Sequence, residues 1–420
     1  MRLNPLVLLV EEDRVVRPNQ GVQTFTYPAD SGFYHLDRVD QHALPLDATY
    51  NYDYTGAGVH IYIVDSGIRG GHQEWGYGRI GASAAFIKWS VNPSPTIDQL
   101  DHGTAVASMA AGTTLGVAKN ATLHSVRIDD GQQPAYESDM LAGIDWVAGH
   151  RILPAVLNLS YDNYGAVANT VSGLKAHGIT LITAAGNDHG ADACNQTTQI
   201  SGVITVGATN RSDERTVYSD QGTCVDLFAP GGETAGFERG YGLLKVASSA
   251  SNSAFIYNGG TSLSSPVVAG VAALILQQNS HLSPDALEYL LQNTATQSVV
   301  TNVDGVTTRR LAYSRPSVPP PPSQPSISIS GPNSIGSPGE YTWYGEVSGT
   351  TESYTVTWDK SLDEGETWSA VGTGDSYSIY EGSGSPHNII FRATLLTQDE
   401  VASSIDYWVY VDTSCGGNIC

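Results

Sequence analysis

The feature that most constrains the fold is an alternation of short β-branched runs with alanine-rich stretches between about residues 33 and 312. The runs have the length of buried strands, and the stretches between them have the length of helices. This alternation predicts an α/β fold, with a parallel sheet that helices cover on both faces. We expect strands at residues 59–64, 122–128, 155–159, 180–184 and 203–208, and helices at residues 103–112, 138–148, 170–177 and 262–278.

Two polar residues stand directly after expected strands, where α/β folds gather their functional groups. Asp65 closes the first apolar run, and Asn187 follows the run at 180–184. Between and beyond them, His102 begins the motif His-Gly-Thr-Ala, and Ser262 lies in Gly-Thr-Ser-Leu-Ser. An acid, an imidazole and a hydroxyl in this chain order form one of the known arrangements of a hydrolytic triad.

The residue types fit nucleophilic catalysis. A serine hydroxyl is a weak nucleophile near neutral pH and needs an adjacent base, for which His102 has a suitable unperturbed pKa. Asp65 would fix the imidazole tautomer, and a helix that starts at Ser262 would direct its N-terminus toward a developing oxyanion. Pro266 would then fall in the first helical turn, where its missing N–H costs little.

Each of these residues also has a structural interpretation. Asp65 can be a strand-end turn, His102 a helix-start residue, Ser262 a helix cap and Asn187 a left-handed loop residue. The order, the spacing and the small neighbours of all four favour the catalytic interpretation.

Together these motifs resemble the subtilisin-like serine proteases, and specifically the proteinase K and aqualysin branch, over about residues 33–311. The resemblance implies a subtilisin-like fold and a secreted serine endopeptidase that cleaves protein or peptide substrates without a catalytic cofactor. It assigns Asp65, His102 and Ser262 to the triad, Ser262 to the acyl-enzyme and Asn187 to the oxyanion donor. Two alternatives stay open, a pseudoprotease that only binds and an esterase or lipase, although the second would show a Gly-x-Ser-x-Gly elbow that is missing here.

The resemblance also assigns a set of substrate-binding residues. They are Gln133, Pro134, Ser160, Tyr161, Asp162, Ala184, Ala185 and Gly186. In the family, two backbone edges hold the peptide as an added strand, and these edges are rich in glycine. Side chains and a proline in those places predict a specificity that differs from the broad one of the family. Asp162 is expected to favour basic residues away from the scissile bond.

A disulfide and a calcium site are implied by the same resemblance. It pairs Cys194 with Cys224 and places a structural Ca²⁺ on the carbonyls of Ser201 and Val203 and the carboxylate of Asp226, and calcium prefers oxygen ligands of this kind. The remaining two cysteines, at positions 415 and 420, stay open between a small terminal ring, free thiols and intermolecular bonds. No Cys/His spacing suggests zinc.

The chain is expected to have five parts. They are a propeptide remnant (1–18), the catalytic domain (19–315), a proline-rich linker (316–325), an immunoglobulin-like β-sandwich (326–412) and a cysteine-containing tail (413–420). An ordinary edge strand is the alternative for the first part. A missing prodomain would be the partner that aids folding and inhibits the enzyme.

The C-terminal sequence contains one Asp-box-like motif, Ser-x-Asp-x-Gly-x-Thr-Trp, at residues 361–368. One copy does not make a propeller, and turn chemistry is enough to explain it. Trp343, Trp358 and Trp408 have two interpretations, a sugar-binding platform or core packing, and core packing is favoured.

Composition limits the partners. The formal charge of −22 excludes nucleic acid, which needs a basic surface. No apolar run approaches a membrane span, and the apolar stretch at residues 1–10 is not expected to be a signal peptide, because acidic residues follow it and a small-residue cleavage site is missing. Four cysteines are compatible with an oxidising compartment, and we expect a secreted monomer.

Overall fold

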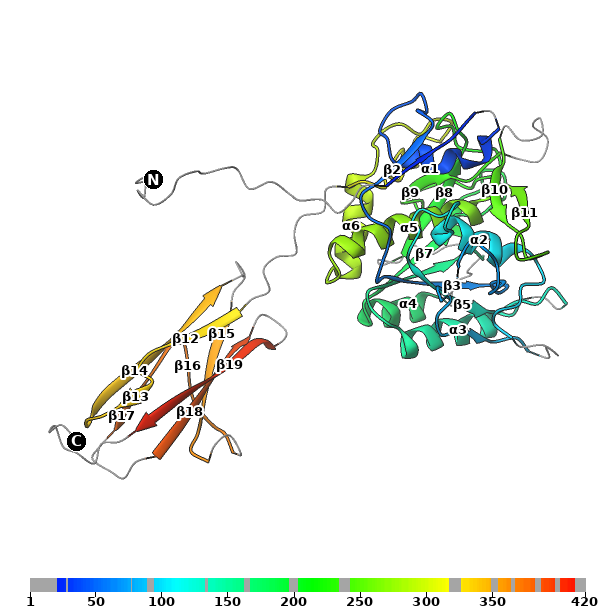
Figure 1. Ribbon diagram of the computed structural model, residues 1–420. Coiled ribbons are helices and arrows are strands. Elements are labelled where there is room, and N and C mark those ends of the chain that lie inside the picture. The colour runs from blue at the N-terminus through cyan, green and yellow to red at the C-terminus, as the bar shows by residue number, and fades with distance from the viewer. Residues whose placement is uncertain are drawn as a thin grey trace. The chain divides into compact units, whose positions relative to one another are not determined.

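The computed structural model describes residues 21–27, 29–76, 78–88, 94–132, 135–161, 167–195, 203–233, 242–316, 326–348, 354–363, 367–381, 387–396 and 401–411. The chain divides into two compact units, Met1–Val318 and Pro319–Cys420 (Figure 1). The expected propeptide segment 1–18, residues 317–325 of the linker and the tail 413–420 lie outside the described residues.

The first unit is built on a seven-stranded sheet in which all neighbouring strands are parallel. In spatial order its strands are β4 (Ala84–Ala85), β5 (Thr122–Arg127), β3 (His60–Asp65), β6 (Ala155–Leu159), β7 (Ile179–Ala184), β8 (Val203–Thr209) and β9 (Leu227–Pro230). Every residue of β6, β7 and β8 is buried, because helices cover both faces. This explains why these segments are continuous apolar runs rather than alternating ones, and the expected parallel sheet is confirmed.

Four helices cover the two faces of this sheet. They are α2 (His102–Ala111), α5 (Thr261–Gln278), α3 (Glu137–His150) and α4 (Val167–Ala176). The residues of β3 show which helices lie on which face. Ile61 and Ile63 belong to the apolar cluster that contains α2 and α5, whereas Tyr62 and Val64 belong to the cluster that contains α3 and Leu174 of α4 (Figure 1). Alternate side chains of one strand thus build two separate cores.

Among the described residues, α5 is the one helix whose length and apolar composition would suffice to cross a membrane. Most of it, 83% of its 18-residue window, is buried inside the protein. It packs against α2 and against strands of the sheet. A helix that is apolar all round is expected at such a central position.

Shorter elements complete the first unit. They are the antiparallel pairs β1 (Gly21–Thr24) with β2 (Thr49–Tyr52) and β10 (Leu244–Ala247) with β11 (Phe255–Asn258), the helices α1 (Tyr34–Val39) and α6 (Pro284–Thr294), and the short helices η1 (Ser31–Phe33) and η2 (Ala193–Asn195).

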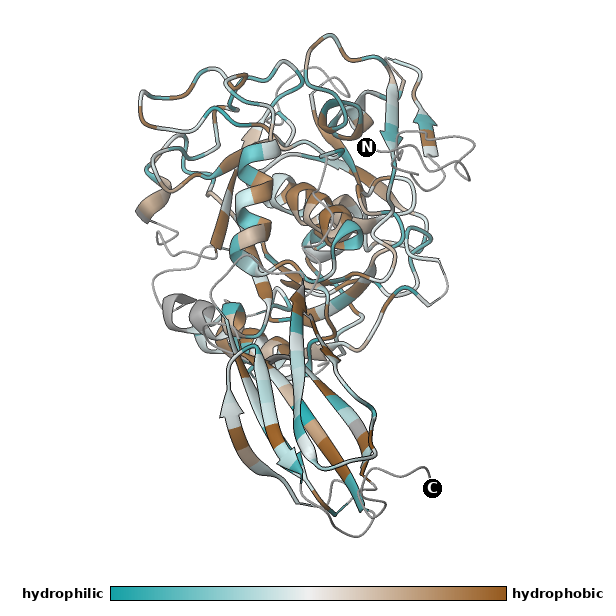
Figure 2. Cartoon of the chain, turned by 90° about the vertical axis from the view of Figure 1, so that its left-hand side faces the viewer, coloured by the Kyte–Doolittle hydropathy of each residue, from teal (hydrophilic) through white to brown (hydrophobic). Residues whose placement is uncertain are grey.

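The second unit is all-β. One sheet contains β12 (Ser326–Ser330), β14 (Gly339–Ser348) and β17 (Ser376–Glu381), and the other contains β13 (Ser334–Ile335), β19 (Val401–Val411), β18 (His387–Leu396), β15 (Thr355–Ser361) and β16 (Ser369–Thr373). All pairs are antiparallel except the short contact of β13 with β19. Hydrophobic and hydrophilic residues alternate along these strands, as half-buried strands require (Figure 2).

Two tryptophans of this unit belong to its core. Trp343 and Trp358 are fully buried, and their indole N–H groups donate to the carbonyls of Pro332 and Gly374 at 2.9 and 2.8 Å. Neither ring can offer a surface to a sugar, so core packing is confirmed for both. The side chain of Trp408 lies outside the described residues.

Candidate active site

Asp65 and His102 lie close together because Gly67 and Gly103 allow the backbone segments next to them to pack tightly. A Cβ on Gly103 would lie 2.1 Å from the carbonyl oxygen of Gly67, so only glycine fits at residue 103. This close contact brings the start of α2 to the carboxyl end of β3. His102 Nδ1 then lies 2.8 Å from Asp65 Oδ1. Asp65 is fully buried, and the same oxygen accepts the N–H of Ser66 at 2.7 Å.

The start of α2 is held by a carboxylate that the sequence did not single out. Asp98 accepts the N–H of Thr104 at 2.9 Å and the hydroxyl of Ser66 at 2.9 Å. The Ser66 oxygen in turn accepts the N–H of Gly103 at 2.9 Å. Asp98 and Ser66 thereby satisfy the free N–H groups of Thr104 and Gly103 in the first helical turn and hold the start of α2 against the end of β3.

The pKa of His102 reflects burial against charge. Burial alone lowers it, but the charge and hydrogen bond of Asp65, followed by the charges of Asp98 and Asp129, raise it above its ordinary value. Negative charge therefore stabilises the imidazolium form at this position.

Ser262 is the second residue of α5, which begins at Thr261 rather than at Ser262. A Cβ on Gly259 would lie 2.3 Å from the carbonyl oxygen of Glu233, so glycine is required where the chain approaches the helix. The Ser262 hydroxyl donates to the carbonyl of Ser160 at 3.4 Å, and no hydrogen bond joins it to His102.

Pro266 is the sixth residue of α5 and lies in its second turn rather than in the expected first turn. Its ring nitrogen has no hydrogen to donate to the carbonyl of Ser262, four residues earlier. That carbonyl instead accepts the hydroxyl of Ser160 at 3.2 Å. The proline thus leaves the Ser262 carbonyl free for a hydrogen bond that connects α5 to the segment after β6.

Asn187 follows β7 on a loop that two contacts anchor. Its side-chain oxygen accepts the N–H and the hydroxyl of Thr261, each at 3.0 Å. Asp220 accepts the N–H groups of Asp188 and Ala191 at 2.9 and 3.1 Å. Because its oxygen faces Thr261, the Asn187 side chain has its N–H₂ group free for another acceptor. Asp220 was missed by sequence reasoning, since it follows no expected strand.

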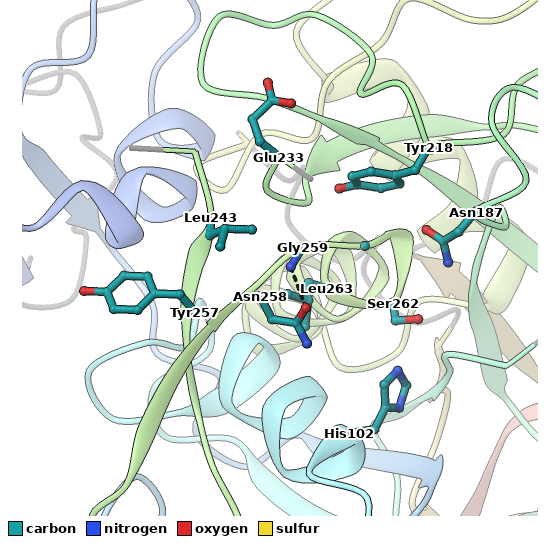
Figure 3. Close-up of a pocket in the computed structure, with 11 residues that line it drawn as sticks. His102, Asn187, Tyr218, Glu233, Leu243, Tyr257, Asn258, Gly259, Ser262 and Leu263 are labelled. Carbon is teal, nitrogen blue, oxygen red and sulfur yellow. Dashed lines mark hydrogen bonds between the residues drawn. The ribbon is translucent and has the colours of Figure 1, made fainter. Parts of the chain in front are cut away.

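His102, Ser262 and Asn187 border a cavity of about 310 Å³. Figure 3 shows the three along one side, with Leu243 and Tyr257 on the opposite side. The remaining lining residues are Tyr218, Glu233, Asn258, Gly259, Gly260 and Leu263. The Ser262 hydroxyl, the His102 imidazole and the Asn187 amide therefore border the same cavity.

The expected substrate-binding residues are described in part. Ser160 and Tyr161 follow β6 beside Ser262 and His102. Ala184 ends β7, and Ala185 and Gly186 lead from it to Asn187. Gln133, Pro134 and Asp162 lie outside the described residues.

Cys194 and Cys224 form a disulfide, as the resemblance implied. The bond connects the η2 region to the segment that leads into β9. Cys224 is buried in a small apolar cluster that includes Phe228 and Leu311.

The described part of the expected calcium site is centred on Asp226. Its carboxylate accepts the N–H of Thr205 at 2.8 Å and the amide of Gln292 at 3.2 Å, and burial raises its pKa to about 7. A bound cation would offset this cost, so the buried Asp226 carboxylate is compatible with an oxygen-liganded Ca²⁺. Ser201 lies outside the described residues. Among the described residues no cluster of three His, Cys, Asp or Glu side chains could hold a metal, so a cation here would depend on carbonyl oxygens.

The chain matches known proteins over the first unit. Residues 56–311 match the subtilase family, Peptidase_S8. An extracellular serine proteinase of Thermus sp. (strain Rt41A) is 39% identical over 317 residues, which are 74% of this chain and 72% of that protein. The alkaline serine exoprotease A of Vibrio alginolyticus is 35% identical over 319 residues, which are 75% of this chain and 56% of that protein.

A solved structure shows the same likeness in three dimensions. The crystal structure of a cold-adapted subtilisin-like serine proteinase matches with a TM-score of 0.61 and 36% identity. The matched region covers 68% of this chain and 100% of the chain in that structure. The family match spans well over half of the chain, and the relatives are named as serine proteinases. The chain therefore belongs to the subtilase family and is a subtilisin-like serine peptidase.

Proposed function

We propose that the protein is a secreted serine endopeptidase that cleaves peptide bonds through an acyl-enzyme on Ser262. The observation that carries the proposal is the 2.8 Å hydrogen bond between Asp65 and His102, beside a cavity that Ser262 and Asn187 also line. An oriented base next to a helix-borne hydroxyl is the arrangement that acyl transfer needs.

In the proposed mechanism His102 takes the proton of the Ser262 hydroxyl through Nε2. Asp65 accepts the Nδ1–H and stabilises the imidazolium that forms. The hydroxyl must first turn away from the Ser160 carbonyl, which accepts its hydrogen at 3.4 Å. That contact is long for an O–H···O bond, so a small free energy suffices to break it.

Asn187 would stabilise the tetrahedral intermediate. Thr261 holds the side-chain oxygen of Asn187 at 3.0 Å, which leaves the amide hydrogens available for the oxyanion. The N–H groups at the start of α5 add to this positive potential.

The proposal includes a peptide-binding edge and a structural calcium ion. Ser160 and Tyr161, with Ala184 to Gly186, would form one wall for the residues before the scissile bond. Ca²⁺ would bind Ser201, Val203 and Asp226 and would supply charge compensation for the buried carboxylate. In an inactive Ser262→Ala background, Ca²⁺ should raise the melting temperature of the protein, and Asp226→Asn should remove most of that increase. An equal increase in both proteins would contradict the assignment.

Secretion and the prodomain complete the proposal. One relative is named an extracellular serine proteinase, and the Cys194–Cys224 disulfide suits an oxidising compartment. A prodomain would aid folding and inhibit the mature enzyme, which we propose to be a monomer with residues 19–315 as its catalytic domain.

The direct test is covalent labelling of the full chain with phenylmethylsulfonyl fluoride, followed by intact mass and peptide mapping. We expect one adduct on Ser262 that is lost in His102→Ala, since only an activated hydroxyl reacts. Far-UV and near-UV circular dichroism serve as the control for folding of both proteins.

The second candidate function is a pseudoprotease that binds peptides without turnover. The contact that favours it is the hydrogen bond of Ser262 to Ser160 instead of to His102. A folded protein that binds peptide but gives no adduct would replace the endopeptidase proposal with this one.

A further inference from the structure

A hydrogen bond crosses the carboxyl end of the central strand β3. In the sheet, β3 lies between β5 and β6, and it carries Asp65 as its last residue. Tyr161 stands two residues beyond β6, and Asp129 stands two residues beyond β5. The Tyr161 hydroxyl donates to Asp129 Oδ2 at 3.0 Å. The two side chains thus connect the strands on either side of Asp65.

The ring of Tyr161 lies against the base. Its centroid is 5.7 Å from that of the His102 imidazole, and the two planes meet at 80°, an edge-to-face arrangement that aromatic rings favour. Tyr161 also packs against the apolar cluster that includes Val64 and Leu159. The residue therefore contacts both the core and the His102 ring.

Asp129 is itself fixed. Its second carboxylate oxygen accepts the N–H of Gly131 at 2.8 Å, and its backbone carbonyl accepts Arg127 Nε at 3.2 Å. The carboxylate that receives the Tyr161 hydroxyl therefore has little freedom to turn away. Burial, followed by the nearby charges of Asp65 and Asp129, raises the pKa of Tyr161, so its hydroxyl keeps the proton that it donates.

We infer that Tyr161 is a positioning residue, whose ring, fixed through its hydroxyl by Asp129, holds the His102 imidazole in line with Asp65. The inference rests on the proposed function and gives Tyr161 a role through His102, in addition to its proposed place in the peptide-binding wall.

The charges around His102 determine in which direction its pKa should change in each variant. Carboxylates face it from three elements, namely Asp65 from β3, Asp98 from the segment before α2 and Asp129 from the segment after β5. Neutralising Asp129 removes one of the charges that raise the His102 pKa, so that pKa should fall. Removing only the Tyr161 hydroxyl leaves the Asp129 charge without that donor, so the His102 pKa should rise.

The first experiment needs no turnover. In a Ser262→Ala background, NMR titration of the histidine ring resonances gives the His102 pKa in three proteins: the parent, Tyr161→Phe and Asp129→Asn. We expect opposite shifts of about 0.5 pH unit, upward for Tyr161→Phe and downward for Asp129→Asn. In the Asp129→Asn background, Tyr161→Phe should cause no further change. Unchanged values in both single variants would overturn the inference.

The second experiment uses the active enzyme. We expect Tyr161→Phe to lower kcat about 3- to 10-fold with KM nearly unchanged, because a misaligned base weakens a transition-state interaction. The acid limb of the pH–rate profile should move with the His102 pKa, since the neutral imidazole is the active form. Tyr161→Leu, which also removes the ring, should lower kcat further.

The matched control is Tyr50→Phe, which removes another buried hydroxyl of the same unit, one that donates to the Val117 carbonyl at 3.1 Å. It should leave the pH profile and kcat unchanged. Equal effects of Tyr50→Phe and Tyr161→Phe would show a general loss of stability and would overturn the inference. Absence of a Ser262 adduct in the parent protein would instead refute the proposed function, while the NMR titration would still decide the role of Tyr161.

Discussion

The two units each contain an aspartate in a motif with neighbouring serine, threonine or glycine, and the two aspartates are bound differently. Asp65 of the first unit is fully buried, and its oxygen bonds a base that belongs to another element, His102. Asp363 of the second unit is bonded by Ser361 and Thr367 of its own turn. These hydrogen bonds, with that of the Thr367 hydroxyl as the largest contribution, lower the pKa of Asp363 to about 2.

This difference separates the carboxylate that we propose for the triad from a structural one. A carboxylate whose bonds stay within its own turn stabilises that turn, whereas one that also orients an imidazole from another element changes what that imidazole can do. The two sequence motifs alone do not show which aspartate has a functional role and which has a structural one. The distinction lies in whether the partner comes from a distant part of the chain.

The largest expected effect is the loss of activity in Ser262→Ala. In subtilisin the removal of this hydroxyl costs about 10⁶-fold in kcat, and we expect a loss of that order here because the nucleophile is gone. Hydrolysis of a peptide amide, followed at high enzyme concentration, measures it. Asp363→Ala is the matched control and should retain full kcat. Residual activity within tenfold of the parent enzyme would refute the assignment of Ser262.

A smaller loss is expected for Asn187→Ala. The amide would act only on the oxyanion, so kcat should fall about 10²- to 10³-fold while KM stays nearly constant. Steady-state kinetics on a peptide substrate separate the two constants. Asn258→Ala, which changes another amide of the same cavity, serves as control. A change confined to KM would assign Asn187 to ground-state binding instead.

Much of the first unit could be predicted from the sequence, because strand-end polar residues and helix-start motifs are local signals. Asp65, His102 and Asn187 all stand next to the apolar runs that became strands and helices. The Cys194–Cys224 bond came from the family resemblance rather than from the residues themselves.

The rest depended on contacts between distant segments. Asp129 follows an expected strand just as Asp65 does, yet nothing in the sequence shows that it bonds Tyr161, 32 residues away. Pro266 lies beyond the expected first turn, because α5 begins at Thr261, five residues before the proline. The side-chain direction of Ser262, toward Ser160 rather than His102, has no sequence signal at all.

The first and the second unit should unfold in separate transitions. Trp358 is fully buried and stacks near Tyr377, with ring centroids 6.2 Å apart, so Trp358→Ala should cost about 3–5 kcal/mol in the second unit alone. Calorimetry in the Ser262→Ala background should show one lowered transition, and peptidase activity of the otherwise unchanged enzyme should persist. Ile182→Ala, in the fully buried strand β7, is the counterpart and should lower the other transition. A common shift of both transitions would show that the units unfold together.

Acid should weaken the first unit through a buried histidine. Burial lowers the pKa of His35 to about 4, although its hydrogen bond to the Leu115 carbonyl opposes this. The unfolded chain takes up the proton near pH 6.5 and the folded protein only near pH 4, so stability is full above pH 6.5 and falls as the pH drops toward 4. The loss from this residue is about 3 kcal/mol over that window.

His35→Gln isolates this contribution, because glutamine keeps a donor for the Leu115 carbonyl and does not titrate. Urea unfolding of the Ser262→Ala protein at pH 7 and pH 4.5, with and without the substitution, gives the difference. Other groups, such as Asp40, whose pKa burial raises to about 6, titrate equally in both proteins and cancel. The second unit should show no dependence on the substitution, since His35 belongs to α1 of the first. If both proteins lost the same stability between the two pH values, the buried imidazole would not be the cause of acid sensitivity, and the like-charged carboxylates of this acidic chain would be the next candidates.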